Sequence, residues 1–384
     1  MDKLFFTDEH IMIRDMVREF ADTEITPVAR DLDEQGEFPT ALVNKMGELG
    51  LMGILIPEEY GGSGLDMVAF ATAIIELARA DASVAITMAA HTSLGSLPIL
   101  MFGSDEQKNT YLPKLATGEM LGAFGLTEPD AGSDAGATKT KAVRDGDEYV
   151  VNGGKIFITN AGKAGVLSFT SQVIENGKNL GIAAFSISTN TPGLEIGPKE
   201  KKMGWRASDT RQLFFKDMRI QATSMLGTPA NGFKTFMKTL TSGRVSIGAL
   251  SIGTALGAYE RALAYSTERI AFGKPINNFQ SVGFKLADMA TKIEASKLLV
   301  FHAAWMKDQG LDITKEAAMA KLFASETAME VTTEAIQIHG GYGYVKEYDV
   351  ERFFRDAKIL EIGEGTSEIQ RLIISRELLK GIQI

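Results

Sequence analysis

The sequence predicts an α+β fold that is mainly α, built from three consecutive parts. Apolar residues recur at helical spacing up to about residue 118, short apolar runs separated by turn residues follow, and helical spacing returns near residue 226. We therefore expect an N-terminal α-helical domain over residues 1–118, a middle antiparallel β-barrel-like domain over 119–225, and a C-terminal four-helix bundle over 226–384.

The first part carries start and stop signals for several helices. A proline limits a helix, a glycine just past the last turn ends one, and a capping box begins one. The expected helices run from Asp8 to before Pro27, over residues 40–49 before Gly50, over 67–79, and onward from the capping box of Ser104 and Gln107. His91 lies in a buried stretch, and we interpret it as a packed, hydrogen-bonded histidine rather than a catalyst.

The middle part reads as strands separated by turns. Asp145-Gly146 and Asn152-Gly153-Gly154 are hairpin signals. The expected strands cover residues 149–151, 156–159, 166–169, 182–187 and 212–215. The loop of residues 122–134 is rich in small and hydroxyl-bearing residues. It either lines a ligand or simply leads into the β unit.

Long helices are expected in the last part. Helical spacing runs over residues 243–269, 280–309 and 314–339, and the glycine-rich residues 340–344 interrupt it. Antiparallel helices of this length are typical of a bundle.

Composition excludes several classes of function. A net charge of −9 leaves no basic surface for nucleic acid. The chain has no cysteine, and its four histidines show no metal-ligand spacing, so we expect no disulfide, thiol nucleophile or metal site. We also expect no signal peptide and no membrane-spanning run. The prediction is a soluble protein of the cytoplasm, or of the mitochondrial matrix if a transit peptide has been removed.

One acidic turn near the C-terminus stands out. Glu364 lies between Gly363 and Gly365, and the next residues read as a helix with Ser367 as N-cap, Gln370 at the third position, and a stop at Gly381. A helix N-terminus suits a phosphate, and glycines let a ligand approach the backbone. The turn could place a general base beside an anion site, or it could be an ordinary surface turn.

Seven motifs, in order along nearly the whole chain, resemble the acyl-CoA dehydrogenase family. They are GLTEPDAGSD at 125–134, NGGKIFITN at 152–160, KMGWRAS at 202–208, Gly243-Arg244, RIAFGKP at 269–275, QIHGGYGY at 337–344, and RDAK at 355–358 with EGTSE at 364–368. The resemblance implies the cofactor FAD, a homotetramer built as a dimer of dimers, and an electron-transferring flavoprotein as electron acceptor.

The reaction implied by this resemblance is α,β-dehydrogenation of an acyl-CoA thioester to the 2-enoyl-CoA. A base removes the α-proton while the β-hydride passes to the flavin. By resemblance the base is Glu364, whose own backbone N–H is one of two donors to the thioester carbonyl. Burial of the carboxylate would raise its pKa toward working pH.

The resemblance also assigns binding residues. Those expected to bind FAD are Phe124, Leu126, Thr127, Gly132, Ser133, Phe157, Ile158, Thr159, Arg269, Phe272, Gln280, Gln337, Ile338, Gly340, Gly341, Thr366, Ser367 and Glu368. Of these, Arg269, Gln280 and residues 337–341 are expected to reach FAD from a neighbouring subunit. Ser133, Arg244 and Gly365 are expected to bind the substrate. Without the resemblance, Arg269 would read as a cation at a helix C-terminus.

Two departures from the family pattern matter. Gly243 occupies the position where some branched- and long-chain members carry the base, and no acidic residue lies shortly before Arg244. Gly363 replaces a tyrosine found in many straight-chain enzymes, which predicts tolerance of a bulkier acyl group. An acyl-CoA oxidase and a non-catalytic flavin-binding relative are the alternatives. The chain's end at Ile384 and the intact Glu364 favour the dehydrogenase.

Overall fold

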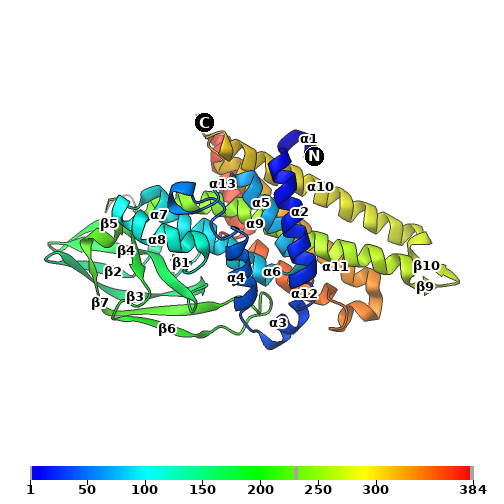
Figure 1. The fold of residues 1–384 in the computed structure, drawn as a ribbon, viewed down its shortest axis with the longest axis horizontal. Helices are drawn as coiled ribbons and strands as arrows, with labels where there is room; N and C mark the ends of the chain where they lie inside the picture. The colour runs from blue at the N-terminus through cyan, green and yellow to red at the C-terminus, as the bar shows by residue number, and fades with distance from the viewer. Residues whose placement is uncertain (1, 229–231, 381–384) are drawn as a thin grey trace.

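The computed structural model describes residues 2–228 and 232–380. It is mainly helical, with a sheet at one end and helices at the other (Figure 1). The N-terminal helices are α1 (Asp2–Phe5), α2 (Asp8–Phe20), α3 (Ala29–Gln35), α4 (Thr40–Glu48), α5 (Met67–Ala80), α6 (Ala82–Ala90), α7 (Leu97–Phe102) and α8 (Asp105–Thr117). The helices expected from the first part are therefore confirmed, and Ser104 with Gln107 forms the expected capping box on α8.

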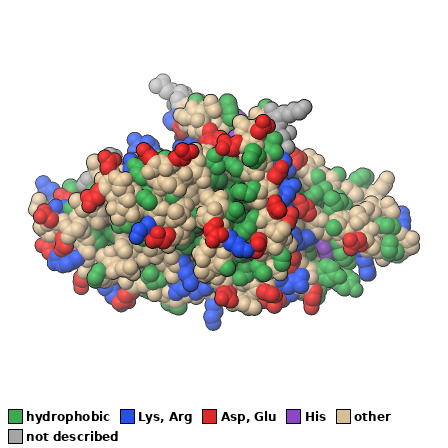
Figure 2. Space-filling view, in the orientation of Figure 1, with side chains coloured by type: hydrophobic (Ala, Val, Ile, Leu, Met, Phe, Trp, Pro, Cys, Tyr) green, Lys and Arg blue, Asp and Glu red, His purple; other side chains and the backbone are tan. Residues whose placement is uncertain are grey.

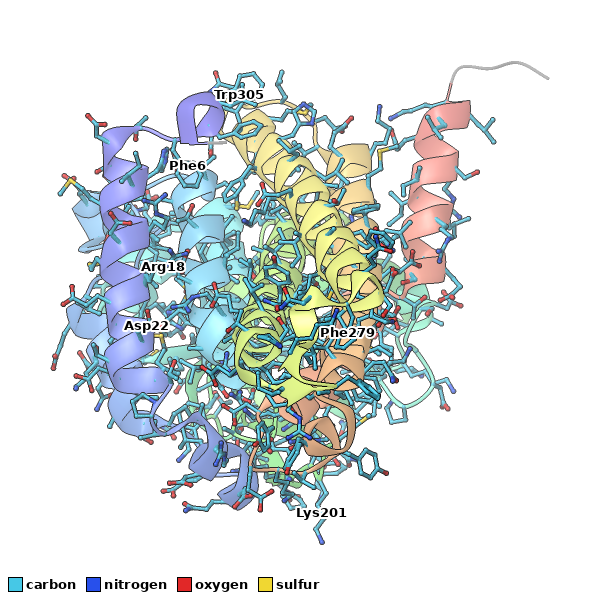
Figure 3. The ribbon with its side chains drawn as sticks, turned by 90° about the vertical axis from the view of Figure 1, so that its right-hand side faces the viewer. Phe6, Arg18, Asp22, Lys201, Phe279 and Trp305 are labelled. Atoms are coloured by element: carbon cyan, nitrogen blue, oxygen red, sulfur yellow. The ribbon has the colours of Figure 1, made fainter. Side chains whose placement is uncertain are left out.

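The outer helix α2 is tied to the core helix α5 by ion pairs. Arg18 Nε lies 2.9 Å from Glu76 Oε2, and Asp22, in the π-helical turn that follows α2, pairs with Arg79. Figure 3 labels Arg18 and Asp22. At the start of the chain the ring of Phe6 packs edge-on against Phe301, with centroids 5.0 Å apart. The ion pairs hold the first helices against α5, and the Phe6–Phe301 contact joins the start of the chain to the last part.

The strands form one open, mixed sheet rather than the expected antiparallel barrel-like domain. The strands are β1 (Leu121–Gly125), β2 (Lys141–Asp145), β3 (Glu148–Thr159), β4 (Ala164–Glu175), β5 (Lys178–Ser188), β6 (Leu194–Lys199), β7 (Thr210–Gln221) and β8 (Met225–Leu226). Their order is β6-β7-β3-β2-β4-β5-β8, and β1 pairs with β4. Both β1 and β2 run parallel to β4, one after the other along its length, so the loop between them leaves the sheet at that junction.

One expected hairpin is confirmed and the other is wrong. Asp145 and Gly146 join β2 to β3 as predicted. Asn152, Gly153 and Gly154 instead lie inside β3, where the pairing with β7 shifts between Val151 and Gly153. Gly153 has φ +144°, and a Cβ there would lie 2.6 Å from Thr140 Oγ1. The glycine is needed for a bulge within a long strand, not for a turn.

The last part is helical, as expected. Its elements are α9 (Gly232–Glu268), the hairpin β9 (Ile270–Ala271) and β10 (Lys274–Pro275), α10 (Gln280–Asp308), α11 (Thr314–His339), α12 (Val350–Ala357) and α13 (Ser367–Leu379). The ranges of α10 and α11 match the predictions, whereas α9 begins eleven residues before Gly243. The expected helix stop at Gly381 lies outside the described residues.

Helix α9 is the central element of the main core. It contacts α5, α10, α11 and α12. Two of its glycines allow close contact with α5: a Cβ at Gly253 would lie 2.4 Å from Ile75 O, and one at Gly257 would lie 2.3 Å from Arg79 O. A second apolar cluster lies within the sheet.

The segment Ala82–Phe102 corrects one exclusion made from the sequence. It is long and apolar enough to cross a membrane, and 83% of its most apolar window is buried inside the protein. Because the fold itself covers this segment, its apolar character is explained by core packing.

Candidate active site

The turn that carries Glu364 has a left-handed backbone. Glu364 has φ +53° and Gly365 has φ +99°. The N-cap of α13 is Thr366, whose Oγ1 accepts from Ile369 N, so the prediction that Ser367 caps this helix is wrong. Gln370 also does not close a capping box. Its Nε2 donates to the Gly365 carbonyl at 2.8 Å and lies 3.4 Å from the Glu364 carbonyl.

The Glu364 carboxylate lies against helix α9 at Gly243. A Cβ built at Gly243 would lie 2.1 Å from Glu364 Oε2 and 3.4 Å from Leu94 Cδ2. Although Glu364 is partly exposed as a residue, Oε2 is buried and has no hydrogen-bond partner among the described residues. One oxygen of the carboxylate is therefore buried without a hydrogen-bond donor among the described residues.

The electrostatics of the site suit a general base. Burial raises the pKa of Glu364 to about 7, although the positive charges of Lys321 and Arg244 pull it down. Arg244 is buried, and burial lowers its pKa against the opposite effect of Glu364. A carboxylate with a pKa near 7 is about half ionised at neutral pH and, when ionised, is a stronger base than an ordinary carboxylate, which suits proton abstraction.

Several other polar atoms near this turn are buried without a partner among the described residues. They are Ser242 Oγ, Arg244 Nε, Ser367 Oγ and Gln370 Oε1. Buried polar atoms are normally hydrogen-bonded, so a cluster of unpaired ones indicates a site for a polar ligand.

A buried ion pair fastens the loop of residues 126–140. Lys155 Nζ lies 2.6 Å from Glu128 Oε1, and it also donates to Leu126 O at 3.2 Å. The Glu128 carboxylate accepts from Thr138 Oγ1 and from the backbone N–H of Lys139. Burial alone would raise the pKa of Glu128, but Lys155 and these donors lower it to about 2. This pair was not predicted from the sequence, where its only signal was a lone lysine directly before the apolar residues 156–158.

The predicted flavin-lining residues divide between surface and core. Phe157 has φ +58° and is 64% exposed, while Ile158 is only 2% exposed and packs in the core of the sheet. Phe124 stacks on Phe236 with centroids 4.1 Å apart. Gly132 and Ser133 are exposed. In this chain Phe157 and the exposed part of the loop are therefore open to a ligand, whereas the Ile158 side chain is not.

A second group of predicted cofactor residues gathers elsewhere. A cavity of about 510 Å³ is lined by Tyr265, Arg269, Ile276, Ile338, His339, Gly340, Gly341, Tyr342 and Val345. Neither Glu364 nor Phe157 lines this cavity, and Phe272 projects from the β9–β10 hairpin with 95% of its surface exposed. The structure thus places the predicted cofactor residues in two regions of one chain.

The residues present fit FAD. The cavity offers an arginine for a phosphate, aromatic rings for stacking, and two glycines whose Cβ positions are open. The unpaired hydroxyl of Ser367 lies in the first turn of α13, where a helix favours negative charge. An exposed aromatic ring at Phe157 offers a further apolar contact.

His91 has a structural role. It is fully buried, its Nδ1 accepts from Gly122 N and its Nε2 donates to Leu115 O, both at 3.0 Å. Burial lowers its pKa to about 4, so the ring is neutral. The interpretation of His91 as a packed histidine is confirmed.

Family models match three successive stretches of the chain. The acyl-CoA dehydrogenase N-terminal domain matches residues 7–119, the middle domain residues 123–218, and the C-terminal domain residues 230–379. The chain belongs to the acyl-CoA dehydrogenase family.

Individual members of the acyl-CoA dehydrogenase family resemble it over almost their full length. It is 54% identical to the probable acyl-CoA dehydrogenase YngJ of Bacillus subtilis, covering 97% of this chain and 99% of that one. It matches the structure of butyryl-CoA dehydrogenase from Megasphaera elsdenii with a TM-score of 0.95 and 43% identity, covering 98% of this chain and 99% of that one.

Two further solved structures bear on cofactor and partner. A structure reported with the electron transferring flavoprotein of Acidaminococcus fermentans matches with a TM-score of 0.96 and 46% identity, covering 98% of this chain and 99% of that one. Acyl-CoA dehydrogenase of Bacillus anthracis, solved with FAD, matches with a TM-score of 0.92 and 38% identity, covering 98% of this chain and 68% of that one.

Proposed function

We propose that this protein is an FAD-dependent acyl-CoA dehydrogenase that uses Glu364 as its base and passes electrons to an electron-transferring flavoprotein. One observation carries the proposal: a carboxylate with a buried, unpaired oxygen and a pKa raised to about 7 lies at the turn where the family motif predicts the base. The full-length similarity to a butyryl-CoA dehydrogenase supports a short acyl chain as substrate.

The chain's own groups account for the proton transfer. The Glu364 carboxylate would take the α-proton, and its backbone N–H would donate to the thioester carbonyl as negative charge develops there. Arg244 would lie on the substrate side, and Ser133 and Gly365 would contact the substrate. FAD, when bound, accepts the β-hydride, so that the bond between the α and β carbons becomes a double bond.

The expected cofactor residues remain our proposal for the FAD site. Phe157 and the loop that contains Leu126, Thr127 and Gly132 would contact the flavin, with Thr366 and Glu368 at the start of α13. We propose that Arg269, Gln280 and residues 337–341 serve the FAD of a neighbouring subunit. The cavity that Arg269, Ile338, Gly340 and Gly341 line includes neither Phe157 nor any residue of that loop, which supports this division.

Anaerobic reduction of the flavin tests the reaction. The purified protein should be yellow and should bleach with butyryl-CoA in the absence of oxygen. Glu364→Gln should retain FAD and lose bleaching by roughly 100-fold or more, because a neutral amide cannot accept the proton. Rapid reoxidation by air, rather than by an electron-transferring flavoprotein, would instead identify an oxidase. Unchanged bleaching in Glu364→Gln would refute the base assignment.

We further propose that Gly363 enlarges the acyl pocket. Gly363 does not adopt a positive φ, and a Cβ there would meet only Ile359, at 3.4 Å from its carbonyl oxygen. The backbone therefore does not require glycine, and a side chain could be accommodated. Isobutyryl-CoA and cyclohexanecarbonyl-CoA should be oxidised beside butyryl-CoA, and Gly363→Tyr should lose the two bulky substrates selectively. Equal turnover of bulky substrates in that variant would contradict the proposal.

The domain boundaries, the assembly, the partners and the location of the protein are also part of the proposal. We propose domains at residues 1–118, 119–225 and 226–384, with α9, α10, α11 and α13 as the four-helix bundle of a homotetramer. We propose no nucleic-acid or membrane partner, no metal site, and a location in the cytoplasm or the mitochondrial matrix. The acidic net charge of −9 supports the absence of a nucleic-acid partner.

A further inference from the structure

Lys321 is a fully buried lysine that reaches the active-site turn from another helix. It lies in α11, its side chain is 0% exposed, and its Nζ donates to the Gly365 carbonyl at 2.8 Å. Lysine is almost never fully buried without a partner. The partner here is the backbone of the residue that directly follows Glu364.

The Gly365 carbonyl has two buried donors. Gln370 Nε2, from α13, donates to the same oxygen at 2.8 Å. The two donors come from different helices, and together they fix the peptide group that follows the left-handed Glu364. Left-handed backbone at a non-glycine residue is strained and persists only where neighbouring groups hold it.

Lys321 differs from Gln370 in its charge. The groups whose charges act on the Lys321 ammonium are Glu364 on the turn, Arg244 on α9, Glu361 before the turn and Glu368 on α13. Burial lowers the pKa of Lys321 to about 8, so it is mostly protonated at neutral pH. Among the groups that act on Glu364, Lys321 and Arg244 are the two cations.

We infer that Lys321 is a positioning residue for the catalytic base: it holds the Glu364–Gly365 turn through the Gly365 carbonyl and keeps a positive charge beside the Glu364 carboxylate. This inference rests on the proposed role of Glu364. Since Lys321 contacts the backbone and not the reacting atoms, it acts through Glu364.

Three variants separate the role of Lys321 as a hydrogen-bond donor to the Gly365 carbonyl from its role as a positive charge near Glu364. Lys321→Met removes both the donor and the charge, Lys321→Arg keeps the charge, and Gln370→Leu removes only a neutral donor from the same carbonyl. In Lys321→Met, the midpoint of the rise of kcat/KM with pH should move up by about one unit, because the positive charge of Lys321 lowers the pKa of Glu364 and its loss would raise that pKa. Its kcat should fall roughly 10-fold as the base is misplaced.

The other two variants give the contrast. Gln370→Leu should also lower kcat roughly 10-fold, but the pH midpoint of its kcat/KM profile should stay at the wild-type value. Lys321→Arg should keep the wild-type midpoint. Lys155→Met serves as a matched control, since Lys155 is equally buried but pairs with Glu128; it should not move the midpoint. A midpoint that stays fixed in Lys321→Met, or moves equally in Lys155→Met, would overturn the inference.

A second readout does not depend on turnover. The infrared carbonyl band of protonated Glu364, identified by its loss in Glu364→Gln, should titrate at higher pH in Lys321→Met than in the wild type. If the wild-type protein fails to bleach with acyl-CoA, the proposed function fails, yet this titration still tests the effect of Lys321 on Glu364. An identical titration in both proteins would refute that effect.

Discussion

At the scale of single residues, the site depends on what surrounds one carboxylate. The Glu364 carboxylate lies against Gly243, and the positive charges of Lys321 and Arg244 act on it. Burial makes the carboxylate more basic, and the two cations limit that effect. The balance leaves a base whose pKa is near working pH.

The first residue-scale prediction concerns pH. Burial raises the pKa of Glu364 to about 7, and the base must be ionised to accept a proton. Activity should therefore be present above pH 7 and be lost as the pH falls through 7. The measurement is kcat/KM for butyryl-CoA between pH 5 and pH 9, the range that brackets this pKa. A profile flat down to pH 5 would mean that the carboxylate has an ordinary pKa.

The second residue-scale prediction concerns Gly243. In Gly243→Ala the new methyl group would collide with Glu364 Oε2, which is the far end of a flexible side chain. The carboxylate should move at little cost in stability, while the bleaching rate should fall at least ~10-fold. Gly283→Ala is the control, because its Cβ would meet only Asn277 O at 3.9 Å. Wild-type bleaching by Gly243→Ala would show that the base does not need this space.

The sequence predicted the turn at Glu364 but not which residue caps the helix that follows it. Thr366 and Ser367 are adjacent hydroxyl residues, and either could cap a helix. Only the backbone decides between them: Thr366 has φ −59° and ψ 163°, outside the helix, and Ser367 is already helical. Gln370 was expected to close a capping box, but its amide is engaged by the Gly365 carbonyl. The roles of Lys321 and Lys155 depend on contacts between distant parts of the chain, which local sequence does not reveal.

At the scale of elements, local signals located most of the long helices, although not the start of α9, and they were insufficient for the sheet. The ranges of α10 and α11 follow from their apolar spacing and their flanking residues. Strand pairing is non-local, so the parallel contacts of β1 and β2 with β4 could not be derived from spacing. The bulge at Gly153 resembles a turn in sequence because both require glycine.

The crossing of α5 and α9 gives the element-scale prediction. A Cβ at Gly253 would lie 2.4 Å from the carbonyl oxygen of Ile75 and 2.6 Å from Ala78 Cβ. Because a helix backbone cannot yield as a side chain does, Gly253→Ala should lower the free energy of unfolding by about 1–3 kcal/mol. Urea denaturation followed by circular dichroism measures this, with Gly283→Ala as control. Equal midpoints in the two variants would contradict the close packing.

At the scale of the whole molecule, apolar side chains remain exposed on the helical half. Hydrophobic side chains are visible over this half, including the end that carries β9 and β10 (Figure 2). Exposed apolar residues of these helices include Leu263 on α9, Phe284, Leu298 and Trp305 on α10, Phe323 on α11, and Leu372, Leu378 and Leu379 on α13. Exposed apolar surface of this kind fits the contact between subunits in the proposed tetramer.

The whole-molecule prediction is therefore an assembly of four chains. Phe284→Asp should reduce the assembled mass measured by light scattering, because Phe284 is 64% exposed and would place a charge within an apolar contact. It should also weaken FAD retention if Arg269 and its neighbours serve an adjacent subunit. Phe214→Asp on β7, where the side chain is 40% exposed but lies on the sheet, should leave the mass unchanged. Monomeric wild-type protein would contradict the tetramer.

The arrangement of β1 along β4 has a consequence for synthesis on the ribosome. Leu121 pairs with Ala164, and β4 is the only strand with which β1 pairs among the described residues. The nascent chain must therefore extend far past β1 before this apolar strand finds its neighbour. Until β4 has been synthesised, β1 is an unpaired strand of the kind that chaperones shield. Pauses in translation before β4 emerges should therefore lower the yield of native protein more than pauses after β4 has emerged.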